Sequence, residues 1–70
     1  MRYLIVLEPT PTGFSAYSPD LDGCVAAASD REETIALMRE SIAVHLEGLA
    51  EAGDPVPEPS SESAYVEVTT

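Results

Sequence analysis

The sequence predicts an α+β fold in which one mixed sheet of four strands carries a single long helix on one face. Two observations lead to this prediction. Residues 2–8, 14–18, 24–28 and 64–70 are short strand-like runs separated by turn-forming residues. Residues 31–52 instead place apolar side chains three and four positions apart, which is the helical period. We expect one domain spanning residues 1–70, in the order strand, strand, strand, helix, strand.

The first predicted strand, residues 2–8, has apolar side chains on both faces. Tyr3, Ile5 and Leu7 project to one side, and Leu4 and Val6 project to the other. Since a strand that is apolar on both sides is usually covered on both, we expect it at the centre of the sheet. Prolines at positions 9 and 11 cannot donate ladder hydrogen bonds, so they end the strand. Residues 14–18 then return antiparallel to it as a hairpin.

A corner separates the second predicted strand from the third. Its sequence, Pro19-Asp20-Leu21-Asp22-Gly23, is rich in turn-forming residues, and Asp side chains in turns often bond the nearby backbone. The third strand, residues 24–28, follows it, although its alanines are weak strand formers. The corner and Cys24 bring two carboxylates and a thiol within five residues. These groups form either a chemical site or a turn.

The predicted helix has clear start and stop signals. Asp30 followed by Glu33 fits a capping box, and Gly53 fits the left-handed residue that ends a helix. A second apolar stripe, Leu37 and Val44, either widens the buried face or contacts another protein, and we take both residues as candidate contacts between copies of the chain. The main apolar stripe should pack on the sheet and comprises Ile35, Met38, Ile42, Leu46 and Leu49.

Residues 64–70 complete the predicted sheet. Ala64, Val66 and Val68 form one apolar side, and the other side is more polar. A helical crossover before this run would place it parallel to the first strand, which gives the sheet order 3-2-1-4. One face of such a sheet carries the helix. The other face needs a cover, which indicates dimerisation or a partner.

The charge of the chain restricts its partners. Thirteen acidic residues stand against three arginines, and the formal net charge is −10. This surface repels nucleic acids and anionic membranes, so we expect no direct binding to either. It attracts basic proteins, and it is equally consistent with simple solubility. A lone cysteine and the absence of a long apolar run predict a soluble, cytoplasmic protein.

Two enzymatic interpretations compete with structural ones. Glu8, Asp20 and Asp22 would suit a Mg²⁺-dependent nuclease, but Asp residues in a turn and a strongly negative charge favour a structural role. Cys24 and His45 would suit a nucleophile and base, but a packed thiol and a helix residue are the simpler interpretation. We therefore expect no catalytic residue, no metal site and no cofactor. A structural dimer of unknown role is a further alternative.

The chain resembles the HicB-like antitoxins of type II toxin–antitoxin systems. The resemblance covers residues 3–59 and is most specific at the corner Pro19-Asp20-Leu21-Asp22-Gly23-Cys24. Further matches are Gly13-Phe14-Ser15-Ala16, the helix start at Asp30, the run Glu40-Ser41-Ile42 and the proline-rich exit after Gly53. One departure is Asp22, which stands where the family usually has a proline.

The resemblance implies a partial RNase H-like fold without nuclease activity. It also implies a cytoplasmic protein that forms dimers or higher oligomers and masks a small basic toxin of the HicA type, which cleaves mRNA. Family members usually add a C-terminal DNA-binding segment, and residues 1–70 contain none and no basic patch. From exposure expected at a sheet corner and from charge, we predict that Tyr17, Asp20 and Asp22 contact the partner.

Overall fold

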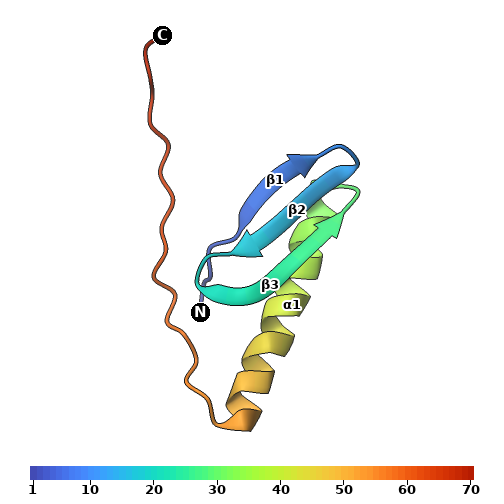
Figure 1. Ribbon diagram of the computed structural model, residues 1–70, viewed down its shortest axis with the longest axis vertical. Helices are drawn as coiled ribbons and strands as arrows, with labels where there is room; N and C mark the ends of the chain where they lie inside the picture. The colour runs from blue at the N-terminus through green and yellow to red at the C-terminus, as the bar shows by residue number, and fades with distance from the viewer.

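The sheet has three strands, and one long helix lies across one of its faces (Figure 1). The computed structural model describes residues Met1–Thr70. The strands are β1 (Val6–Thr10), β2 (Gly13–Ser18) and β3 (Leu21–Ala28), and they are followed by the helix α1 (Arg31–Ala52). Both strand pairs are antiparallel and the order is β1-β2-β3. The helix does not combine the length and the apolar character that crossing a bilayer requires.

The predicted four-stranded mixed sheet of order 3-2-1-4 is wrong. Residues 64–70 form no strand, and Figure 1 shows them running apart from β1. The first strand is consequently an edge strand, and β2 is the central one. The pattern of residues 64–70 suits an extended chain, and the chain there is extended. A strand also needs a neighbour to bond, and these residues have none within the molecule.

A two-residue turn at Pro11 and Thr12 joins β1 to β2, because Thr10 pairs with Gly13. Gly13 is required here by a close backbone approach. A Cβ atom at this position would overlap the carbonyl oxygen of Ala28 and lie 2.7 Å from the Cα atom of Ser29. Any side chain would therefore push the end of β3 away from the hairpin.

The helix begins and ends as the sequence predicts. Asp30 caps its start, and its Oδ1 atom accepts a hydrogen bond from the Glu33 amide at 2.7 Å. Gly53 ends it with φ 73° and ψ 16°, in the left-handed region. The amides of Gly53 and Asp54 then bond the carbonyl oxygens of Ala50 and Leu49 at 3.2 and 2.9 Å. Local sequence signals therefore determine both ends.

The core lies between α1 and the inner face of the sheet. Its fully buried apolar members are Ala16, Leu21, Cys24 and Met38. Two polar side chains are buried with them and are satisfied. The Ser18 hydroxyl donates to the Leu4 carbonyl oxygen at 2.9 Å. The second buried polar side chain is Thr34, whose hydroxyl donates to the Asp30 carbonyl oxygen at 2.8 Å.

The C-terminal segment, which we define as residues 54–70, leaves the end of α1 and passes the N-terminus (Figure 1). The Tyr3 hydroxyl donates a hydrogen bond to the Pro57 carbonyl oxygen at 2.5 Å. Partial removal from water raises the pKa of Tyr3, and the negative charges of Glu58 and Asp20 raise it further. The segment is thus held to the folded body in its first half only.

Candidate protein-binding face

The outer face of the sheet, turned away from α1, carries an apolar row in which Tyr17 and Val25 are exposed and Val6 is half-buried. Tyr17 of β2 lies directly between Val6 of β1 and Val25 of β3 in the strand register. The Tyr17 and Val25 side chains are 42% and 65% exposed. Their neighbours in sequence, Ala16 and Cys24, are buried against the helix, as the alternation of a strand requires. The row Val6–Tyr17–Val25 therefore forms the centre of an open face.

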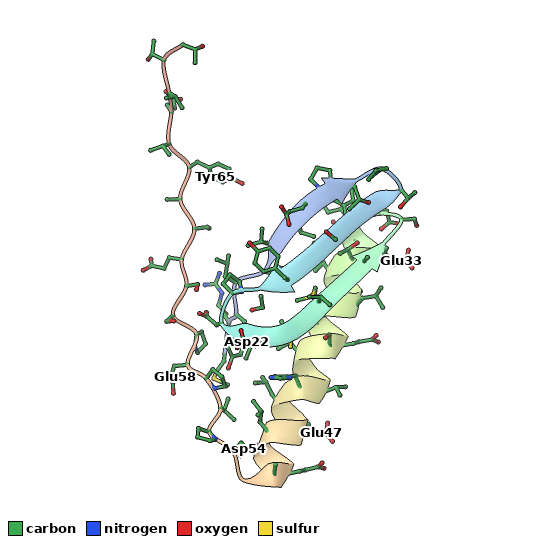
Figure 2. All side chains as sticks on the ribbon, in the orientation of Figure 1. Asp22, Glu33, Glu47, Asp54, Glu58 and Tyr65 are labelled. Carbon is green, nitrogen blue, oxygen red and sulfur yellow. The ribbon has the colours of Figure 1, made fainter.

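Exposed acidic side chains lie toward the two ends of the sheet. Glu8 is exposed on β1 and pairs with Ser15, two residues beyond the apolar row. Asp22 is exposed near the start of β3, at the opposite end of the sheet (Figure 2). An apolar centre that contains a tyrosine, with a charged rim, has the composition of a protein-binding surface.

Asp20 bonds another part of its own chain. Its Oδ2 atom accepts hydrogen bonds from the amides of Ser60 and Ser61, both at 3.0 Å. Its Oδ1 atom accepts from their hydroxyls at 3.1 and 2.8 Å. These bonds, first those from Ser61, lower the pKa of Asp20 to about 2. We call this arrangement the Asp20 clamp, since it ties the C-terminal segment to the corner between β2 and β3.

The predicted contact residues therefore differ in their surroundings. Tyr17 lies at the centre of the open face, and Asp22 is free at its rim. The carboxylate of Asp20 is occupied by the clamp. Leu37 and Val44, the candidate contacts between copies, are 38% and 69% exposed on the helix.

The residues of the two enzymatic interpretations are not assembled into a site. No group of three His, Cys, Asp or Glu side chains could hold a metal ion. Glu8 pairs with Ser15 and stands toward the other end of β2 from Asp20. Cys24 is buried in the core, and His45 is half-buried on α1 with no hydrogen bond between them. The arrangement offers a surface for binding and no set of converging reactive groups.

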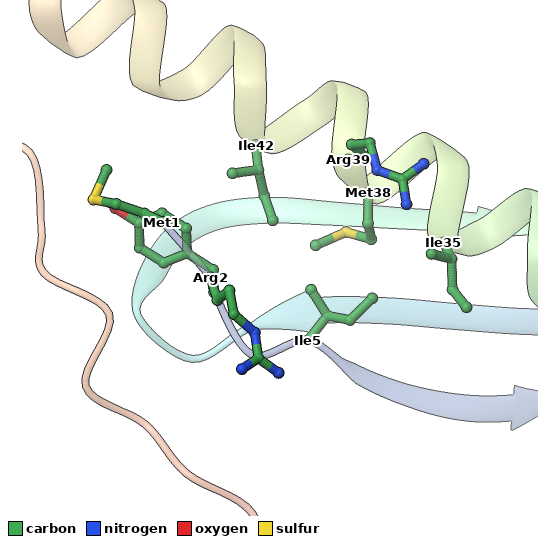
Figure 3. Close-up of a pocket in the computed structure, with 8 residues that line it drawn as sticks. Met1, Arg2, Ile5, Ile35, Met38, Arg39 and Ile42 are labelled. Atoms are coloured by element: carbon green, nitrogen blue, oxygen red, sulfur yellow. The ribbon is translucent and has the colours of Figure 1, made fainter.

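A groove on the α1 side of the sheet was not expected from the sequence. It has a volume of about 370 Å³ and lies between the N-terminal residues and α1 (Figure 3). Two of the three arginines, Arg2 and Arg39, are among its lining residues. Its apolar lining comprises Met1, Tyr3, Ile5, Ile35, Met38 and Ile42. The apolar pattern of residues 3–7 indicated buried positions, but nothing in it indicated that part of this surface would remain open.

Known proteins similar to this chain include one family and two solved structures. The family described as the HicB_like antitoxin of bacterial toxin-antitoxin system matches residues 3–69. Two similar solved structures are a chain of a HicA3 and HicB3 toxin-antitoxin complex and the antitoxin HicB3. Each is 37% identical to this chain with a TM-score of 0.71, and each match covers 86% of it. The matches cover 70% and 44% of those two chains, respectively.

A further similar protein comes from a bacteriophage. It is an uncharacterized 14.9 kDa protein of the rep-hol intergenic region of Haemophilus phage HP1 (strain HP1c1), 29% identical over 66 residues. The match covers 94% of this chain, which spans 50% of the length of the phage protein. The family match takes in nearly every residue, including the corner and the C-terminal segment. This chain therefore belongs to the HicB-like antitoxin family.

Proposed function

We propose that this chain neutralises a small basic toxin of the HicA type by covering it with the outer face of the sheet. The observation that carries the proposal is the open row Val6–Tyr17–Val25 in a chain of this family. Support for the partner comes from the similar chain that was solved in a HicA3 and HicB3 complex. The role requires no catalysis, and a toxin that cuts mRNA would be met in the cytoplasm.

The proposed contact has an apolar centre and an electrostatic rim. Tyrosine is frequent among the residues that dominate binding energy, because it buries a large rigid ring and keeps a polar end. Tyr17 lies between two valines that would exclude water around it. The net charge of −10 would attract a basic toxin and speed the encounter. The acids Glu8 and Asp22 at the rim would then orient it.

The direct test is binding to a small basic toxin of the HicA type. We expect a stable complex by isothermal titration calorimetry and rescue of cells from its toxicity. Tyr17→Ala should weaken binding at least tenfold, about 1.4 kcal/mol, because it removes the centre of the contact. Val44→Ala is the matched control, since Val44 is also apolar and exposed but lies on the helix. No complex and no rescue would rule out the proposed function.

Association kinetics test the charged rim separately. Asp22→Asn should slow association and reduce its dependence on salt, while dissociation changes little. Glu47→Gln is the control for loss of one charge, since Glu47 is exposed on α1, away from the sheet (Figure 2). If Glu47→Gln slows association as much as Asp22→Asn, the toxin approaches along the helix, and the outer face of the sheet is not its docking surface.

A further inference from the structure

The outer edge of β3 carries free backbone groups. β3 pairs with β2 alone. Of the 33 backbone–backbone hydrogen bonds, 30 lie within the helix and the strands, and the other 3 lie at the two ends of α1. The hydrogen bonds between side chains and backbone involve no backbone atom of residues 21–28. Alternate amides and carbonyl oxygens of β3 therefore point outward without a partner in the chain.

The two edge strands differ in their protection against pairing. β1 has five residues, includes Pro9, which cannot donate, and carries the charge of Glu8. Residues 61–63 line a channel together with Leu7 on that side of the sheet. β3 has eight residues, and after Asp22 it contains neither a proline nor a charge. Figure 1 shows the C-terminal segment on the β1 side, so the β3 edge is the one open to an extended segment of another molecule.

The regular part of this edge is residues 25–28. They pair in step with residues 14–17 of β2, and the register then shifts, because Ser18 pairs with Leu21. The residues in between, 22–24, form a bulge in which Gly23 has a φ of 82°. Since a bulge interrupts the ladder, an added segment would lie beside residues 25–28 and stop at the bulge.

Val25 belongs both to this edge and to the apolar row of the outer face. It is 65% exposed, compared with 42% for Tyr17, so the least covered member of the row is the one at the edge. A strand added to β3 would place a side chain beside Val25 on the outer face, at the usual strand spacing of about 4.8 Å. The face and the edge therefore form one continuous surface, on which a single partner can bury side chains and pair its backbone.

The charges around the edge favour a basic occupant. Asp22 is exposed near the start of β3, and Glu33 is exposed near its end (Figure 2). Asp30 follows β3 and is exposed as well. Arg31 is paired with Glu32 at 3.2 Å, so it does not offset these acids. A second copy of the chain would bring another formal charge of −10 to an acidic edge, and repulsion disfavours that pairing.

We propose that the β3 edge pairs with an extended segment of the basic toxin, which adds a strand beside residues 25–28. The inference rests on the proposed function and specifies how the partner is held. Side chains of the toxin meet the row Val6–Tyr17–Val25, while its backbone bonds the outward groups of β3. In this mode the backbone bonds contribute affinity, and the side chains select the partner.

Amide hydrogen exchange, measured by nuclear magnetic resonance, tests the pairing. In the free chain, the outward amides among residues 25–28 should exchange rapidly, since only the inward ones are bonded to β2. An excess of a basic toxin of the HicA type should slow the outward amides about tenfold or more, at every second residue. The outward amides of β1 are the matched control and should keep their rates. Unchanged outward amides of β3 in a formed complex would overturn the inference.

Proline variants provide the second measurement. Consecutive amides of a strand point to opposite edges, so one of Ala26→Pro and Ala27→Pro removes an outward donor, and the other removes a bond to β2. The outward variant should remain folded by circular dichroism and bind the toxin about tenfold more weakly, or worse. Serine at the same position keeps the N–H group and should bind as the parent does. Parent-like binding of a folded outward proline variant would contradict the pairing. If both proline variants unfold, the exchange rates of the parent decide.

The two proposals fail in different ways. A toxin complex detected by calorimetry, with unchanged β3 amides, retains the proposed function and removes the edge pairing. The absence of any complex removes both. Outward β3 amides that slow in the concentrated chain without toxin would assign the edge to a second copy and overturn the inference.

Discussion

The folded body, residues 6–53, and the C-terminal segment differ in packing far more than in composition. Both contain alternating apolar residues, and both contain three prolines. In the body, Ala16 and Cys24 are buried because neighbouring strands and α1 cover them. In the segment, Val66 and Val68 are exposed, since nothing within the molecule covers them. An alternating pattern thus determines local conformation, and burial depends on a partner elsewhere in the chain or outside it.

The largest expected effect lies in the body. Met38 is fully buried against the sheet, so Met38→Ala should lower the free energy of unfolding by about 2–5 kcal/mol. A domain of this size is stabilised by roughly 4–10 kcal/mol in total, so the variant should be close to unfolded. Urea unfolding followed by circular dichroism measures the change.

Val68→Ala is the matched variant in the segment. It should change the free energy of unfolding by less than about 0.5 kcal/mol at low protein concentration, where copies are apart. Should Val68→Ala cost as much as Met38→Ala there, the segment belongs to the cooperative unit of the body, and the contrast between the two regions is wrong.

An intermediate effect is expected at the start of α1. Asp30→Ala removes the acceptor for the Glu33 amide and should cost about 1 kcal/mol. Asp22→Ala removes an equal charge from an exposed side chain that makes no hydrogen bond, so it serves as the control. The same urea titration compares them. Equal losses would mean that net charge, and not the cap, determines the result.

The smallest effect on the body is expected at Asp20. Asp20→Ala should leave the stability of the body nearly unchanged and release the C-terminal segment. Amide hydrogen exchange at Ser60 and Ser61, measured by nuclear magnetic resonance, should accelerate in this variant and not in Asp22→Ala. Protected amides in Asp20→Ala would show that other contacts, such as that of Tyr3 with Pro57, hold the segment alone.

The clamp also has a defined pH dependence. The pKa of Asp20 is about 2 in the folded chain, and it is 3.8 for an aspartate that lacks these hydrogen bonds. The folded state therefore favours the carboxylate. The contribution of the clamp is therefore complete above pH 3.8 and is lost as the pH falls through about 2. The protection of Ser60 and Ser61 should follow this course. Loss of protection near pH 5 would contradict it.

Short-range signals were sufficient for the elements that depend on near neighbours. The helix bounds followed from Asp30 and Gly53, whose bonding partners lie within four residues. The meander of the first three strands followed from the turn-forming residues after position 8 and in the corner at 19–23. The strand bounds were wrong, because β1 begins at Val6 and continues through Pro9 to Thr10, and β3 begins at Leu21. The family resemblance, drawn from the corner around Asp20, was confirmed by the match over residues 3–69.

Long-range contacts were the source of the errors. The apolar pair Leu4 and Val6 suggested a central strand, but their side of the sheet is the open face, and β1 lies at the edge. The clamp joins Asp20 to residues forty positions away, and no local pattern reports such a distance. Tyr17 could be identified as a contact candidate, whereas the row that it forms with Val6 and Val25 required the strand register.

The Asp20 clamp also shortens a tether. Without it, the Tyr3–Pro57 hydrogen bond would leave about thirteen residues free, and with it only about nine move freely. The local concentration of a tethered group falls roughly as the −3/2 power of tether length, so the clamp raises it about 1.7-fold around its new origin. That origin is the corner of the sheet between β2 and β3. One aspartate thus determines which surface the end of the chain searches.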